Sequence, residues 1–63
     1  MTLKEFINIT DGIDEFQVWD GEKFYLQNDY SCGIPAETAK KRVINIEFRI
    51  ETYDEKIAIV EVE

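Results

Sequence analysis

The chain has 63 residues and a formal net charge of −7, with fourteen Asp and Glu against seven Lys and Arg. So short a chain makes one domain, residues 1–63, and buries only about 60% of the surface that its unfolded state exposes. It has one cysteine and no histidine, which excludes an intramolecular disulfide and, in practice, a structural zinc site. Apolar packing or self-association must therefore supply the stability.

The first predicted element is a short helix that begins after Thr2. Thr2 and Glu5 have the spacing of a capping box, and Leu3 and Phe6 fall on one helical face. Asp11-Gly12 is a typical stop signal. Because this helix has barely two turns, it can persist only by packing that face on another element.

Residues 15–27 are predicted to form a β-hairpin, because apolar residues alternate on both sides of the turn signal Asp20-Gly21. A two-residue turn at Asp20-Gly21 would place the two apolar sets on opposite faces of the hairpin. A three-residue loop from Trp19 to Gly21 instead pairs Phe16 with Phe24 on one face. We expect the three-residue loop, because a one-residue slip would expose half of the core.

A loop is expected at residues 28–34, and a second helix is expected to begin at Pro35 and to end in the basic run 40–42. Strict alternation predicts a strand over residues 43–52, a turn follows at 53–55, and residues 56–63 form the last strand. The fold class is therefore α+β with the order α-β-β-α-β-β. We expect a four-stranded, mostly antiparallel sheet with two short helices on one face. The order of the strands does not follow from these patterns.

The predicted core joins the inward residues of all four strands to the apolar face of the first helix. In the last two strands, Ala58, Val60 and Val62 are expected opposite Ile50, Phe48 and Ile46. The full set is Leu3, Phe6, Phe16, Val18, Phe24, Leu26, Ile44, Ile46, Phe48, Ile50, Val60 and Val62.

No catalytic, cofactor or metal site is expected. Ser31 and Cys32 have no imidazole to activate them, and Cys32 is expected to be a small apolar filler rather than a reactive thiol. The three glycines lie far apart, so no phosphate-binding loop is present. The acids between Asp11 and Glu22 do not have the spacing of an EF-hand loop, and a solvated acidic rim is expected instead.

The acidity leaves two interpretations open, because net negative charge can keep a small protein soluble or can attract a basic partner. Direct nucleic-acid binding is not expected, since the chain has few cations with which to neutralise phosphates. If a partner binds, the hairpin is the expected surface, because Trp and Tyr are enriched in interface hot spots. Alternatively, the rings of Trp19 and Tyr25 only cover the sheet. The predicted partner-binding residues are Trp19, Tyr25, Asp14, Glu15, Asp20 and Glu22.

Self-association is expected through the last strand. Ile57 and Ile59 fall on the face opposite to Ala58, Val60 and Val62, which would leave two isoleucines exposed on a strand that could lie at the sheet edge. The alternative is that they pack on Tyr53 and on the stems of nearby basic side chains. We expect a homodimer or a larger homo-oligomer.

The chain is expected to be cytoplasmic and to stay off membranes. Its apolar runs are only a few residues long, far below the length of a membrane span. The segment Met1–Glu5 lacks the basic and apolar regions of a signal peptide.

Three segments together, Thr2-Leu3-Lys4-Glu5, Val18-Trp19-Asp20-Gly21 and Ile57–Glu63, resemble the short acidic proteins of phages and mobile elements of Gram-positive bacteria. That class includes anti-CRISPR and other anti-defence inhibitors, several of them acidic proteins that occupy a nucleic-acid channel of their target. The resemblance implies a non-catalytic inhibitor that acts in the host cytoplasm on a basic protein, such as a nucleic-acid-binding enzyme. It transfers no functional residue. A homo-oligomeric accessory module and a small-ligand-binding or sequestering protein are the alternatives.

Overall fold

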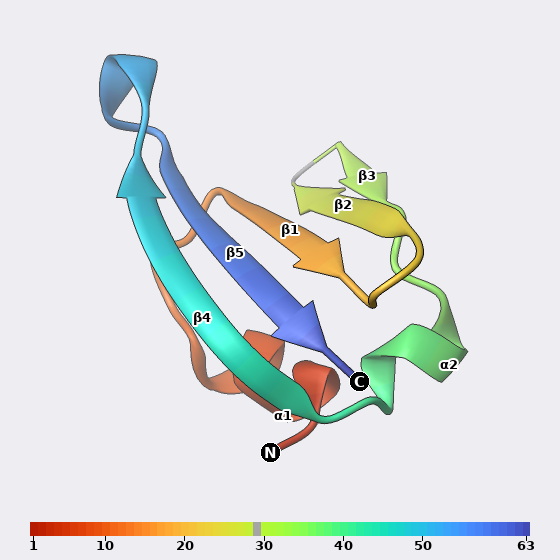
Figure 1. Cartoon of the computed structure of the whole chain (residues 1–63). Coiled ribbons are helices and arrows are strands. Elements are labelled where there is room, and N and C mark those ends of the chain that lie inside the picture. Colours follow the sequence, from red (N-terminus) through yellow and green to blue (C-terminus); the bar gives the residue numbers. More distant parts are fainter. Residues whose placement is uncertain (29) are drawn as a thin grey trace.

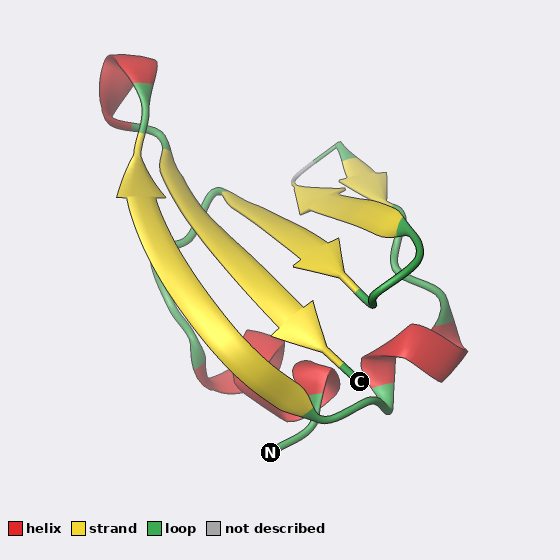
Figure 2. Cartoon of the chain, in the orientation of Figure 1, coloured by secondary structure: helices red, strands yellow, loops and turns green. Residues whose placement is uncertain are grey.

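The computed structural model describes residues 1–28 and 30–63, with Ser31 and Cys32 described in their backbone only. The prediction for the Cys32 side chain lies outside this described part. Within it, two helices and four of the five strands follow the predicted order α-β-β-α-β-β. The additional strand is the two-residue β3, which lies in the predicted loop. The elements are α1 (Leu3–Ile9), β1 (Glu15–Trp19), β2 (Phe24–Asn28), β3 (Ser31–Cys32), α2 (Ala36–Ala39), β4 (Val43–Ile50), the 3-10 turn η1 (Thr52–Asp54) and β5 (Lys56–Val62) (Figures 1 and 2).

Helix α1 begins at the predicted capping box. The Glu5 N–H donates to Thr2 Oγ1 over 3.2 Å, and the Thr2 N–H donates to Glu5 Oε1 over 2.8 Å. This hydrogen bond from the Thr2 backbone holds the pKa of the Glu5 carboxyl below its ordinary value. The helix ends at Thr10, whose N–H and hydroxyl both donate to the Phe6 carbonyl. Leu3 and Phe6 are buried, as predicted.

Helix α2 is a single turn. Pro35 is its N-cap and Lys40 its C-cap. The sequence predicted Pro35 as the first residue of the helix, but the first helical residue is Ala36. Lys41 and Arg42 lie beyond the helix, and the Arg42 backbone exchanges two hydrogen bonds with Glu63 at the end of β5. Thr38 is the buried residue of this helix, and α2 contacts α1.

The sheet has the order β3-β2-β1-β5-β4 (Figure 1). Only the pair β1–β5 is parallel; the other described pairs are antiparallel, which confirms the mostly antiparallel prediction. The last strand of the chain therefore lies inside the sheet, between β1 and β4, and β4 forms one edge. This arrangement places residues 14–15 beside residues 55–57, about forty positions later in the sequence.

In the part of the chain that the structure describes, both helices lie on one face of the sheet, the helix face, and no helix lies on the other, the open face. The buried cluster on the helix face contains six of the predicted core residues together with Ala58: Leu3, Phe6, Phe16, Val18, Ala58, Val60 and Val62. The rings of Phe6 and Phe16 meet edge to face with centroids 6.0 Å apart. This cluster joins α1 to the two central strands.

The predicted burial of Phe24 and Leu26 is wrong. The hairpin pairs Val18 with Tyr25 and Trp19 with Phe24, so Phe24 and Leu26 lie on the open face, exposed. The loop is closed by residues 20–23, with the Asp20 N–H donating to the Lys23 carbonyl over 3.2 Å. The expected three-residue loop is therefore also wrong. That loop would have paired Phe16 with Phe24, whereas Phe16 lies opposite Gln27.

The predicted burial of the β4 residues Ile44, Ile46, Phe48 and Ile50 is also wrong, since all four are exposed. The pairing of β4 with β5 differs from the expected one by two residues: Ala58 lies opposite Phe48, Val60 opposite Ile46, and Val62 opposite Val43 beyond a bulge. Ile46, Phe48 and Ile50 do lie on the helix face. The seven-residue α1 reaches this strand at Phe48, whose ring centroid lies 6.4 Å from that of Phe6, but Phe48 is still 60% exposed.

Within the described residues, neither helix is long enough or apolar enough to cross a membrane.

Candidate binding site

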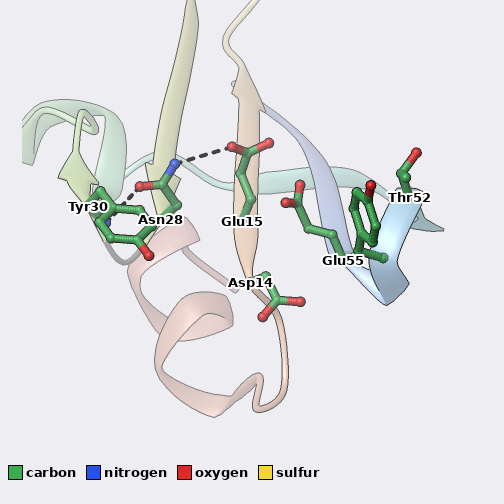
Figure 3. Close-up of a pocket in the computed structure, with 7 residues that line it drawn as sticks. Asp14, Glu15, Asn28, Tyr30, Thr52 and Glu55 are labelled. Carbon is green, nitrogen blue, oxygen red and sulfur yellow. Dashed lines mark hydrogen bonds between the residues drawn. The ribbon is translucent and has the colours of Figure 1, made fainter.

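A hollow of about 380 Å³ opens at the end of the sheet where β1 and β5 begin and β4 ends (Figure 3). Seven residues line it: Asp14, Glu15, Asn28, Tyr30, Thr52, Tyr53 and Glu55. Three of the seven are carboxylates and two are tyrosines. We call this feature the acidic hollow.

The parallel pairing of β1 with β5 assembles the acidic hollow. Two hydrogen bonds hold Asp14 to the backbone of Lys56. The Asp14 N–H donates to the Lys56 carbonyl, and Asp14 Oδ2 accepts the Lys56 N–H, each over 2.8 Å. Glu55 precedes this contact and closes the turn with Glu51, whose N–H donates to the Glu55 carbonyl over 2.8 Å. Segments far apart in the sequence are thus held together by backbone hydrogen bonds.

The Glu15 carboxylate lies in the middle of the acidic hollow, between Asn28 and Glu55 (Figure 3). Its Oε2 accepts from Gln17 Nε2 over 2.8 Å and its Oε1 from Asn28 Nδ2 over 3.3 Å. Asn28 Oδ1 in turn accepts the Tyr30 N–H over 2.9 Å. These amides orient the carboxylate but are neutral, so they leave its charge uncompensated.

Two tyrosines flank the carboxylates from opposite loops. Tyr30 is 97% exposed and Tyr53 is 98% exposed. Tyr53 and Asp54 adopt left-handed backbone angles, with φ of 63° and 59°. Such angles cost a residue with a side chain of order 1–3 kcal/mol and occur where the surrounding structure enforces them. Here, the short turn between β4 and β5 holds the Tyr53 ring out in solvent rather than against the core.

The charges of the molecule separate along the sheet. In the described residues, none of the carboxylates of the acidic hollow forms an ion pair, and the three ion pairs of that part are Lys41–Asp20, Arg42–Glu63 and Arg49–Glu47. Most of the cations lie at the other end, beside the start of β4 and the hairpin loop: Lys4, Lys23, Lys40, Lys41 and Arg42. The acidic hollow is therefore the end of the molecule with the least compensated negative charge.

The structure divides the predicted partner-binding residues between the two ends of β1. Asp14 and Glu15 line the acidic hollow, whereas Trp19, Asp20 and Glu22 lie at the far end of the strand, about 13 Å or more away at 3.3 Å per residue. The prediction had grouped these acids with Trp19 on one hairpin surface. An extended strand separates them instead.

Asp20 and Tyr25 have structural contacts. Asp20 Oδ1 accepts the N–H groups of Glu22 over 2.9 Å and Lys23 over 2.7 Å, and Oδ2 lies 3.4 Å from the Tyr25 hydroxyl and 3.7 Å from Lys41 Nζ. Tyr25 packs against the core on the helix face, whereas Trp19 lies on the open face, so the two predicted aromatic residues do not share one surface. Glu22 is exposed in the loop.

The open face carries a second group of exposed apolar side chains, formed by Trp19, Phe24 and Leu26. Trp19 lies directly opposite Phe24, and Leu26 lies opposite Gln17, the neighbour of Ile59. Trp19 is 40% exposed there, and its neighbours are apolar residues that the sequence had assigned to the core.

Ile57 and Ile59, the predicted self-association residues, lie on an inner strand. The premise that they are two exposed isoleucines on an edge strand is wrong, because β5 lies between β1 and β4 and Ile57 is buried. Ile59 is half-buried on the open face. Self-association itself stays a prediction. The edge strands of the sheet are β4 and the two-residue β3.

Sequence reasoning missed five of the residues that line the acidic hollow, namely Asn28, Tyr30, Thr52, Tyr53 and Glu55. The available signal was two tyrosines in segments expected to be turn and loop, where no core could bury them. The sequence did not show that these residues lie close to Asp14 and Glu15, because that depends on the parallel pairing of β1 with β5.

In the described part of the chain, no three Cys, Asp or Glu side chains are placed to hold a metal ion together. The acidic hollow is thus arranged to accept hydrogen bonds and positive charge, and its tyrosine rings offer π faces to a cation. In comparisons with protein-family models, with curated proteins and with solved structures, no match to this chain was found.

Proposed function

We propose that this chain is a non-catalytic acidic binding protein that engages a basic site on another protein, and that an arginine or lysine side chain of that partner enters the acidic hollow. The observation that carries the proposal is a set of three carboxylates without ion-pair partners in the described structure, lying between two fully exposed tyrosines. A guanidinium or ammonium group satisfies both, because it donates hydrogen bonds to carboxylates and stacks on aromatic rings.

The separation of charge supports a directed approach of such a partner. The net charge of −7 attracts a basic surface from a distance, and the concentration of cations at the opposite end turns the acidic hollow toward it. The hollow lies beside exposed loops rather than in a closed cavity, which suits a side chain that projects from a protein surface.

The partner class that fits this chemistry is a protein with a Lys- and Arg-lined channel, such as a nucleic-acid-binding enzyme. The resemblance to acidic phage and mobile-element proteins favours an anti-defence inhibitor that acts in the host cytoplasm. A charged channel offers many basic side chains at once, so the single contact at the hollow would position a larger electrostatic interface.

The proposal is tested by NMR titration of the labelled protein with a capped tri-arginine peptide and with its neutral tri-citrulline analogue. The arginine peptide should shift the amide signals of Asp14, Glu15 and residues 52–56, and its affinity should fall as salt is raised. The citrulline peptide should leave these signals in place, because it keeps the shape and loses the charge.

The matched variants are Glu55→Gln and Glu37→Gln, each of which removes one negative charge. Glu55 lines the acidic hollow, whereas Glu37 lies on the exposed surface of α2. Glu55→Gln should weaken arginine-peptide binding by about two- to fivefold, the usual worth of one exposed ion pair, and Glu37→Gln should have a much smaller effect. Equal weakening by both variants would show that only total charge matters, and the interpretation as an accessory module would then replace this one.

A further inference from the structure

Strand β4 is a long edge of the sheet, and no other strand among the described residues lies on its outer side. At its start, the Val43 N–H donates to the Met1 carbonyl over 2.9 Å, and Thr2 bridges to Arg42. At its end, the chain turns away into η1 at Thr52. The free edge therefore extends from Ile44 to Glu51. Edge strands of this length are usually blocked by a proline, a bulge or inward charges, and the segment 46–50 has none of these.

Three residues of this strand, Ile46, Phe48 and Ile50, combine backbone groups that face the free edge with apolar side chains that are exposed on the helix face. An antiparallel ladder alternates between hydrogen-bonded and non-hydrogen-bonded pairs, and Glu51 bonds to Glu55 across the β4–β5 turn. Counting back from that pair, Ile46, Phe48 and Ile50 occupy non-hydrogen-bonded positions, so their N–H and C=O groups face the free edge. Their side chains are 38%, 60% and 72% exposed.

We propose that β4 pairs antiparallel with β4 of a second copy of this chain, about a twofold axis at Phe48. This register places Phe48 opposite the partner's Phe48, and Ile46 opposite the partner's Ile50, along the helix face. It uses residues 45–51 of each copy, which lie within the free edge. The exposed apolar side chains of the two copies then pack beside one another, and the free backbone groups find partners.

The charges on the open face select this register. Glu47 lies opposite the partner's Arg49, and Arg49 lies opposite the partner's Glu47, at non-hydrogen-bonded positions where side chains approach most closely. Within one chain these two residues already form an exposed ion pair. A second copy therefore adds two complementary contacts without burying an unpaired charge.

The neighbouring registers are less favourable. A shift of two residues in one direction places Arg49 opposite Arg49 and Glu47 opposite Glu51, and the same shift in the other direction places Glu47 opposite Glu47. Like charges directly opposite each other destabilise a sheet. Larger shifts either move the contact past Glu51 into the turn or toward the segment of β4 that Met1 and Thr2 already cover.

The test is a pair of charge variants studied by sedimentation equilibrium. Glu47→Lys places Lys opposite Arg49, and Arg49→Glu places Glu opposite Glu47, so each variant alone should have a dimer dissociation constant raised about tenfold or more. Mixed together, the two variants restore both opposite-charge contacts and should form a heterodimer with near wild-type affinity. Both residues are exposed, so folding should be unaffected.

A single-cysteine experiment reports the register directly. In a Cys32→Ser background, Phe48→Cys should form an intermolecular disulfide under mild oxidation, because paired Cα atoms at about 5.5 Å lie within disulfide range. Ile50→Cys is the matched control and should crosslink poorly, since its opposite residue is Ile46. Rapid crosslinking of both would contradict the register.

Two results would overturn the proposal. The first is a wild-type protein that stays monomeric at millimolar concentration. The second is a dimer whose affinity is unchanged by either charge variant and whose mixture shows no preference for the heterodimer, which would indicate face-to-face packing. Neither result bears on the acidic hollow, because Glu47 and Arg49 do not line it. Arginine-peptide binding can therefore fail or succeed independently.

Discussion

At the scale of single residues, Asp20 was predicted to bind a partner, but its carboxylate stabilises the hairpin loop. Its carboxylate accepts two backbone N–H groups of its own loop and lies beside the Tyr25 hydroxyl and Lys41 Nζ. The hydrogen bonds from Lys23 and Glu22 hold the pKa of Asp20 below its ordinary value. The charged form is therefore favoured by folding.

Asp20 should make the stability of the hairpin depend on acid. A carboxyl group whose pKa is lowered in the folded state stabilises the fold fully above its unfolded pKa, about 3.9, and loses that contribution as pH falls through the lower folded value. Asp20→Asn should thus reduce the urea midpoint at pH 7 and flatten its fall below pH 4. Glu22→Gln is the control for removal of a charge in the same loop. Parallel pH curves for Asp20→Asn and the wild type would exclude this role.

At the scale of elements, the hairpin offers two phenylalanines with opposite environments. Phe16 is 7% exposed and packs on Phe6, whereas Phe24 is 52% exposed on the open face. Phe16→Ala should cost about 3–5 kcal/mol, a large part of the stability of a small domain, and Phe24→Ala about 1 kcal/mol or less. Chemical denaturation of both variants measures the difference. Equal losses would mean that the hairpin has a different register.

The strand β4 shows what alternation in a sequence can and cannot predict. The alternating isoleucines and phenylalanine correctly predicted a strand and correctly placed Ile46, Phe48 and Ile50 on one face with Ala58, Val60 and Val62. They did not predict burial, because alternation states which residues share a face and not whether anything covers it. Helix α1 was predicted to be short, but its reach across the sheet depends on a strand order that the sequence does not specify.

At the scale of the whole molecule, the central position of β5 decides most of what sequence patterns missed. Placing the last strand between β1 and β4 buries Ile57, makes β4 an edge and brings Glu55 beside Asp14 and Glu15. No short-range pattern encodes a parallel contact across about forty residues. The acidity of the chain follows from its composition, but the grouping of Asp14, Glu15 and Glu55 at one end follows only from this topology.

Trp19 is the only tryptophan of the chain, and its partial exposure on the open face makes its emission an optical marker for that surface alone. Arginine peptides in the acidic hollow, at the far end of β1, should leave the emission maximum unchanged. A protein that docked on the open face would exclude water from the indole and shift the emission to shorter wavelength. A blue shift that accompanies peptide binding would therefore place the contact at the hairpin and not at the hollow, which a fluorimeter can decide before any residue is changed.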